Sequence, residues 1–142
     1  MKKRLLFLVT ALALALGPVV RAQDSETELG SKMEKISSAW RIAKRQLGDA
    51  SKNADTLAKL ATVKENMTAS LKLEPEIKKE KPAGEQAKFV ADYQAAMKGE
   101  IKKVDEIIAL VKAGKNAEAQ KLAGLIDQGQ KDAHKQFKKP KK

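Results

Sequence analysis

Residues 85–113 read EQAKFVADYQAAMKGEIKKVDEIIALVKA, a long stretch with one repeating apolar pattern. Its large apolar side chains recur at every third or fourth position, at Phe89, Val90, Tyr93, Met97, Ile101, Val104, Ile108 and Val111. This spacing places them on one face of an α-helix, and that face must be covered by other elements. Gly114 follows and suits a left-handed helix cap. We therefore predict a long amphipathic helix that ends at this glycine.

A shorter helix is predicted before position 48. Ser25 and Glu28 have the spacing of a capping box, in which each side chain bonds a free backbone N–H of the first turn. An apolar stripe follows at helical spacing, at Leu29, Met33, Ile36, Trp40, Ala43 and Leu47. Gly48 and Asp49 then end the pattern.

Two further helices complete the pattern. One covers residues 57–71 with a thinner apolar stripe and is followed by a connection with Pro75 and Pro82, longer than the ~2–8 residues usual between helices of a bundle. The other begins at Asn116, which we expect to cap it, and has its stripe at Ala119, Leu122, Ile126, Gly129, Ala133 and Phe137. Four amphipathic helices without strand alternation predict an all-α fold, an antiparallel up-down-up-down four-helix bundle.

Residues 1–22 have the pattern of a secretory signal peptide. Lys2, Lys3 and Arg4 precede an apolar run that is shorter than the ~20 residues of a membrane span, and Ala22 is suited to the last position before cleavage. We expect residues 23–142 to form the mature protein, a single four-helix-bundle domain in the periplasm without stable membrane insertion.

The composition limits the chemistry available to this domain. The chain has no cysteine and one histidine, so ordinary zinc sites and haem attached through CxxCH are excluded. Di-iron Glu-x-x-His pairs, glycine-rich phosphate loops and GxSxG are also absent from the sequence. Without residues 1–22, 25 basic and 18 acidic residues remain, a net charge of +7 that favours an acidic partner. We expect no nucleic-acid partner for an exported protein.

The one histidine, His134, belongs to the end of the fourth predicted helix, and Met33 belongs to the start of the first. In the predicted bundle these two helix ends lie at the same end of the molecule, so the side chains can face each other. A methionine and a histidine on opposite sides of a porphyrin hold a six-coordinate haem iron in electron-transfer proteins. Two other interpretations stay open at this point: Met33 as a filler of the apolar core, and His134 as a surface residue that favours a helix C-terminus.

Both ends of the mature chain resemble the cytochrome b562 family of periplasmic haem proteins. Met33-Glu34, followed by Ile36 and Trp40, is similar to the family's early-helix methionine and the apolar positions after it. Gly114-Lys115-x-x-Glu118-Ala119-Gln120, followed by His134 and Phe137, is similar to its third turn and ligand helix. The resemblance covers nearly all of residues 28–137, with a longer connection between the second and third helices.

The resemblance implies an electron-transfer protein that binds one noncovalent haem b per chain, with Met33 and His134 as the axial iron ligands. The residues expected to line the haem pocket are Ile36, Trp40, Tyr93, Met97, Ile126 and Phe137. Lys135 and Lys138 are hypothesised to neutralise the haem propionates. An iron with two protein ligands leaves no position for substrate, so we expect no enzymatic activity, and we expect a monomer with an unidentified redox partner.

Two alternatives follow from the same residues. One is a haem-free periplasmic bundle that binds acidic partners or serves in envelope stress through its basic face. The other is adsorption to anionic membrane surfaces through the lysine-rich C-terminus, five of whose last eight residues are lysines.

Overall fold

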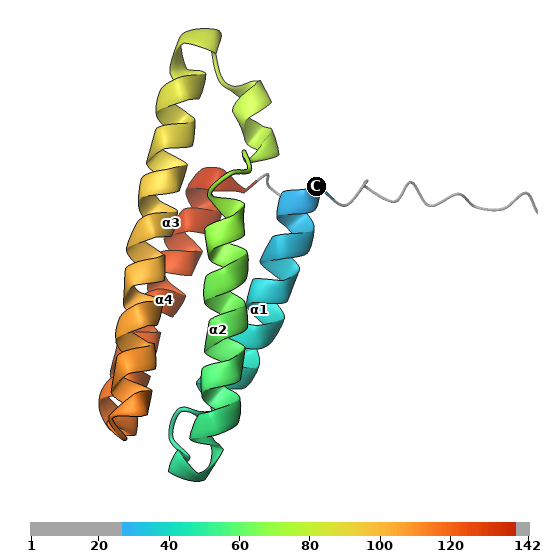
Figure 1. Ribbon diagram of the computed structural model, residues 1–142. Helices are drawn as coiled ribbons and strands as arrows, with labels where there is room; N and C mark the ends of the chain where they lie inside the picture. The colour runs from blue at the N-terminus through green and yellow to red at the C-terminus, as the bar shows by residue number, and fades with distance from the viewer. Residues whose placement is uncertain (1–26, 139–142) are drawn as a thin grey trace, which may run out of the picture.

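The computed structural model describes residues 27–138, and these fold as a four-helix bundle. The helices are α1 (Glu28–Gln46), α2 (Asn53–Ser70), α3 (Ala83–Lys112) and α4 (Asn116–Phe137). Successive helices run in opposite directions, so the start of α1 and the end of α4 lie at the same end of the bundle (Figure 1). The predicted fold class is confirmed, whereas the proposed signal peptide lies outside the described residues.

Short 3₁₀ helices occupy two of the connections. One, η1 (Ala50–Lys52), joins α1 to α2, and the other, η2 (Glu76–Glu80), lies in the long connection that the proline residues predict between α2 and α3. The third connection turns at Gly114, which has a φ of 71°, so the predicted left-handed cap is confirmed. None of the described helices is long and apolar enough to cross a membrane.

Two of the predicted helix caps differ in the structure. Thr27 caps α1, because its hydroxyl accepts a hydrogen bond from the Gly30 N–H at 3.0 Å, while Ser25 lies outside the described residues. Asn116 is the first residue inside α4 and does not cap it. Its side-chain amide instead donates to the Leu47 carbonyl at 2.6 Å and to Asn53 Oδ1 at 2.8 Å. This asparagine therefore ties the end of α1 and the start of α2 to α4.

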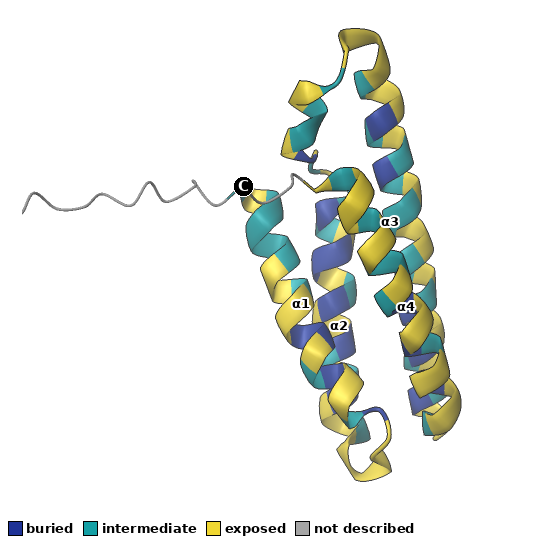
Figure 2. Cartoon of the chain, turned by 180° about the vertical axis from the view of Figure 1, so that it is seen from behind, coloured by how far each residue is buried: buried dark blue, intermediate teal, exposed yellow. Residues whose placement is uncertain are grey.

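The aliphatic core is densest in the half of the bundle that contains this asparagine network. Leu47, Leu60, Val104, Ile107 and Val111 are almost completely buried there. Figure 2 shows that the outward faces of α1 and α4 are mainly exposed, while α2 behind them carries much of the buried surface. In the other half, apolar side chains of α1 and α3 are only half-buried, among them Met33, Ile36, Met97 and Ile101. The two halves of the bundle therefore differ in how completely their helices cover one another.

Candidate functional site

A polar bridge joins α1 to α4 near the middle of both helices. The indole Nε1–H of Trp40 donates a hydrogen bond to Asp127 Oδ1 at 2.9 Å, and the Lys44 ammonium donates to Asp127 Oδ2 at 2.8 Å. We call these three residues the Asp127 bridge. It fixes which residue of α1 faces which residue of α4, because one carboxylate is held by two side chains one helical turn apart.

The Asp127 bridge sets the positions of Met33 and His134. Met33 precedes Trp40 by seven residues, and His134 follows Asp127 by seven. Seven residues rotate an α-helix by about 700°, within about 20° of two full turns, and advance it by about 10.5 Å. Because the two helices run in opposite directions, both steps lead toward the same end of the bundle. Ideal helix geometry therefore puts Met33 and His134 at about the same level, each within about 20° of the side of its helix that makes the bridge.

In the described residues, α1 and α4 are only loosely associated between the Asp127 bridge and the start of α1. The closely packed helix pairs are α1 with α2, α2 with α3 and α3 with α4, and the pair α1 with α4 is not one of them. Within residues 27–138, no hydrogen bond or ion pair links α1 to α4 between the level of Asp127 and the start of α1. Met33 is half-buried and belongs neither to the core cluster nor to the half-buried side chains that pack against it. Its surroundings therefore do not support the interpretation of Met33 as a core filler.

His134 lies in the last turn of α4, where it remains accessible to solvent. Partial burial lowers the pKa of its imidazole below the usual 6.5, and the positive charge of Lys138 lowers that pKa further. The imidazole is therefore neutral at pH 7, and a neutral imidazole has the free nitrogen lone pair that a metal ligand needs. This electrostatic setting suits a ligand better than a charged cap of the helix C-terminus.

The six predicted pocket residues fall into two groups. Ile36, Trp40, Met97 and Ile126 belong to the core cluster or pack directly against it. Tyr93 and Phe137 form a separate aromatic cluster with Phe89, in which the Phe137 ring centroid lies 5.4 Å from that of Phe89 and 5.6 Å from that of Tyr93. Phe137 follows His134 by about one turn of α4, so the aromatic cluster adjoins the histidine.

Tyr93 is held firmly within the aromatic cluster. Its hydroxyl donates a hydrogen bond to the Ser70 carbonyl at 3.1 Å, and its side chain is buried. Burial raises the pKa of Tyr93 to about 12, so the ring remains neutral at physiological pH. The cluster thereby connects the end of α2 to α3 and α4 and provides an apolar wall beside the last turn of α4.

Sequence reasoning missed Phe89 and Asp127 as members of this site. Phe89 precedes Tyr93 by one turn on the same apolar stripe, so the periodicity places it on the correct face and could have added it to the pocket. Asp127 gives no comparable indication, since nothing in the sequence distinguishes it from Asp132, the other aspartate of α4. Only the contact with Trp40 identifies it.

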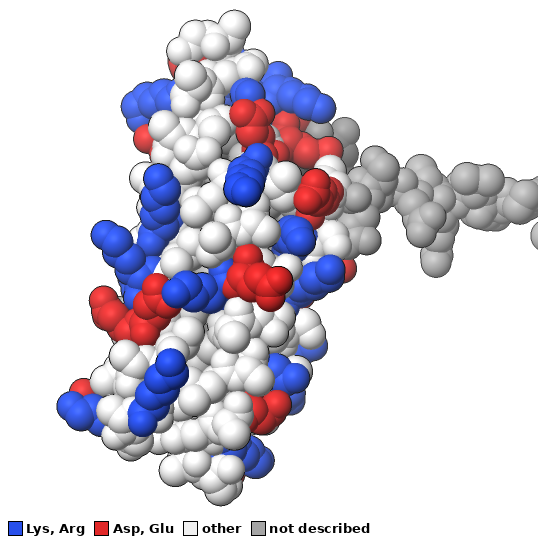
Figure 3. Space-filling view, viewed as in Figure 1, with Lys and Arg blue, Asp and Glu red and all other residues white. Residues whose placement is uncertain are grey.

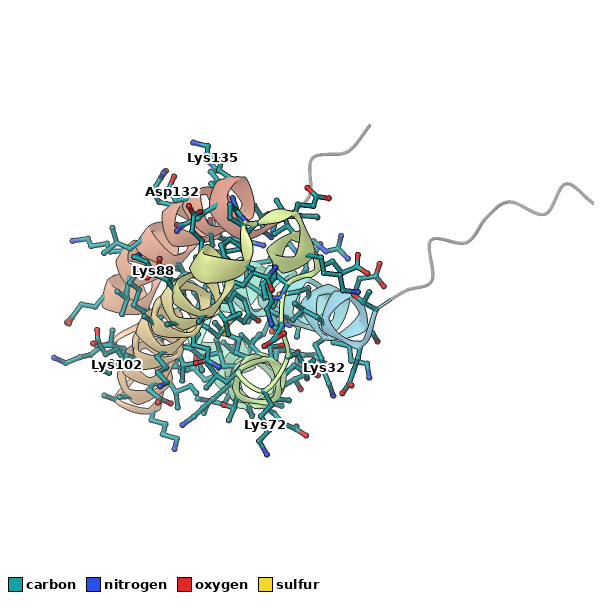
Figure 4. All side chains as sticks on the ribbon, turned by 90° about the horizontal axis from the view of Figure 1, so that it is seen from above. Lys32, Lys72, Lys88, Lys102, Asp132 and Lys135 are labelled. Atoms are coloured by element: carbon teal, nitrogen blue, oxygen red, sulfur yellow. The ribbon has the colours of Figure 1, made fainter. Side chains whose placement is uncertain are left out.

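The lysines at the end of α4 differ in their placement. The Lys135 side chain points outward from the bundle, as does that of Asp132 (Figure 4), and the two form an exposed ion pair at 3.7 Å. Lys138 is close enough to His134 for its charge to lower the histidine pKa. Of the two lysines hypothesised to neutralise propionates, Lys138 therefore lies nearer to the ligand position.

On the face of the bundle in Figure 3, basic and acidic side chains are interspersed. Ion pairing also joins neighbouring helices, since Lys64 of α2 and Asp105 of α3 form an ion pair at 2.6 Å. Such pairs leave no continuous basic surface on this side of the described chain.

A comparison with protein families agrees with this geometry. The model of the family described as Cytochrome b562 matches residues 28–138, which is nearly all of the described chain. No curated protein matches the chain.

Proposed function

Because the chain belongs to the cytochrome b562 family of haem-binding electron-transfer proteins, we propose that it carries single electrons on one noncovalent haem b, with Met33 and His134 as the axial ligands. The observation that supports this assignment best is the Asp127 bridge, because Met33 and His134 lie seven residues, or about two helical turns, from its α1 and α4 members in the direction of the same end of the bundle. Both are ligand types that hold haem iron in cytochromes.

The surrounding side chains fit a flat apolar cofactor. Ile36 and Trp40 continue the Met33 stripe of α1, Met97 belongs to α3, and Phe137 is the last residue of α4. When bound, haem supplies an iron that alternates between the ferric and ferrous states. The chain's own residues exclude water from it with apolar walls, hold it with two neutral ligands, and offer the Lys138 ammonium to an anionic propionate.

Two neutral axial ligands leave no site on the iron for a substrate, so the proposed protein is an electron carrier without enzymatic turnover. We place it in the periplasm, because residues 1–22 have the pattern of a cleaved signal peptide. Its redox partner is proposed to be acidic, in keeping with the net charge of the mature chain.

Haemin titration of residues 23–142 tests the proposal. Trp40 is the only tryptophan of the chain, so quenching of its fluorescence reports haem binding independently of the haem absorption band. We expect one-to-one binding and a low-spin reduced spectrum. Met33→Ala should open one axial position and allow the reduced protein to bind carbon monoxide, whereas His134→Ala should weaken haem binding itself.

Met67→Ala is a suitable control, because Met67 is a buried core methionine of α2 and lies outside the proposed pocket. It should reduce stability without changing the ligands of the iron. A folded mature protein that binds no haem would exclude the electron-transfer proposal, whereas a spectrum that Met33→Ala and His134→Ala both leave unchanged would exclude these two residues as the ligands.

A further inference from the structure

The Asp127 bridge differs from most of the exposed ion pairs of the described chain in its burial and in joining two helices. Asp127 is half-buried, its two oxygens have different partners, and both partners belong to α1. Trp40, one of the two, is itself a buried core residue. By comparison, seven of the nine ion pairs in the described chain join residues only three or four positions apart in the sequence. The bridge therefore belongs to the tertiary structure.

Electrostatics agree with a bridge that is formed throughout the neutral pH range. Partial burial alone would raise the pKa of Asp127. Hydrogen bonds from Lys44 and Trp40, with the charges of Lys44 and Lys131, outweigh that effect and lower the pKa below 3.8. The carboxylate is thus ionised at neutral pH, and charge-assisted hydrogen bonds are shorter and stronger than neutral ones.

The position of the bridge matters because, in the described residues, it is the polar contact between α1 and α4 nearest to Met33, while α1 is otherwise held by its packing against α2. Toward the opposite end, Asn116 holds the end of α1 against α4 through the Leu47 carbonyl. Toward Met33, the Asp127 bridge is the last polar link between α1 and α4 within residues 27–138. Without the bridge, the position of the first two turns of α1 relative to α4 would depend on the packing of α1 against α2.

We propose that Asp127 is a positioning residue for Met33, which holds α1 at the distance and register from α4 that let the Met33 sulfur and the His134 nitrogen bind the same iron. This inference rests on the proposed haem function. Asp127 does not touch the iron in this scheme. It acts through Trp40 and the backbone of α1, and the consequence of losing it is loss of the methionine ligand while the histidine remains.

Three substitutions separate the parts of the bridge. Trp40→Phe keeps a large aromatic side chain and removes the indole N–H donor. Asp127→Asn keeps one oxygen acceptor for that N–H and removes the charge that holds Lys44. Asp127→Ala removes both bonds. Asp132→Asn is the matched control, because Asp132 is an exposed carboxylate of the same helix whose ion pair is with Lys135 of α4.

The first measurement uses the haem-free protein. Since the chain has no cysteine, Ser37→Cys on α1 and Gln136→Cys on α4 provide two unique and exposed positions for spin labels. We expect one narrow distance distribution in the parent and in Asp132→Asn, and a broader and longer one in Asp127→Ala and Trp40→Phe. Asp127→Asn should fall between them. Parent-like distributions in both Asp127→Ala and Trp40→Phe would overturn the proposal.

The second measurement uses the haem-loaded protein and follows the methionine ligand directly, through the thioether-to-iron absorption band of the ferric state and carbon monoxide binding to the ferrous state. We expect Asp127→Ala to increase the fraction of iron without methionine by about tenfold, the factor expected for losing a charge-assisted hydrogen bond. Asp132→Asn should match the parent. A merely structural role would lower stability while leaving the thioether band intact, which would also refute the inference.

The two measurements distinguish failure of this inference from failure of the haem proposal. If the parent binds no haem, the proposed function fails, and the label distances still decide whether Asp127 holds α1 against α4. If the parent binds haem through Met33 and His134 and Asp127→Ala does the same, the function stands and the positioning role is wrong.

Discussion

Substituting Gly129 by alanine tests how α3 packs against the ligand helix. A Cβ atom built on Gly129 would lie 2.9 Å from the carboxyl carbon of Glu100 and would overlap the nearer carboxylate oxygen. Glu100 lies in the interface between α3 and α4 with its side chain 17% exposed, and its Oε1 accepts a hydrogen bond from Lys103 at 2.8 Å. The added methyl group would therefore have to displace this carboxylate.

Two opposing effects determine the result. Replacing glycine by alanine inside a helix stabilises it by about 1 kcal/mol, since alanine loses less backbone entropy on folding. Moving Glu100 breaks its pair with Lys103, worth about 0.5–1 kcal/mol, and crowding a packed interface costs about 1–3 kcal/mol. We therefore expect Gly129→Ala to destabilise the bundle by about 1–2 kcal/mol.

The test is a double-mutant cycle followed by urea denaturation of the haem-free protein. In a Glu100→Ala background the obstacle is gone, so Gly129→Ala should stabilise the bundle by about 1 kcal/mol and the coupling should reach about 2–3 kcal/mol. Gly124→Ala is the matched control on the same helix, where a Cβ meets nothing within 4 Å, and it should stabilise by about 1 kcal/mol in either background. If Gly129→Ala and Gly124→Ala stabilise the parent equally, the packing argument is wrong.

Three further predictions concern single groups. Tyr93 has a raised pKa, so the stability it contributes is complete below pH 10.0 and is lost as the pH rises to about 12. Absorbance of the only tyrosine should show that its ionisation coincides with alkaline unfolding, and Tyr93→Phe should reduce the loss of stability at high pH. Asp127 has a lowered pKa, so its contribution to stability is present above pH 3.8 and is lost as the pH falls through the lowered value. The stability of Asp127→Asn in acid denaturation should therefore depend less on pH below 3.8 than that of the parent protein. Leu47 is completely buried, so Leu47→Ala should lower the free energy of unfolding by about 2.7–5 kcal/mol in denaturant titrations. A cost below about 1 kcal/mol would mean that this part of the core is loosely packed.

The spacing of apolar residues along the sequence was sufficient to predict the four helices and the bundle. The stripe from Phe89 to Val111 predicts α3, and the glycine at 114 predicts its end, because helix spacing and left-handed backbone conformation are local properties. The caps were less predictable. Asn116 has the side chain of an N-cap, but it bonds to Leu47 and Asn53 instead, since a neighbouring helix offered it better partners than its own first turn.

The candidate site was also only partly predictable from the sequence. The sequence by itself determined that Met33 belongs to the first helix and His134 to the last, and that both lie on or beside the apolar stripe of their helix. It could not determine that these faces meet, because the relative rotation of two helices depends on contacts far apart in the sequence. Only the tertiary structure decided how α1 is aligned with α4, through the bond between Trp40 and Asp127, which are separated by 87 positions. Helix formation depends on neighbouring residues, whereas the alignment of α1 with α4 depends on one carboxylate whose two partners lie 87 and 83 positions away in the sequence.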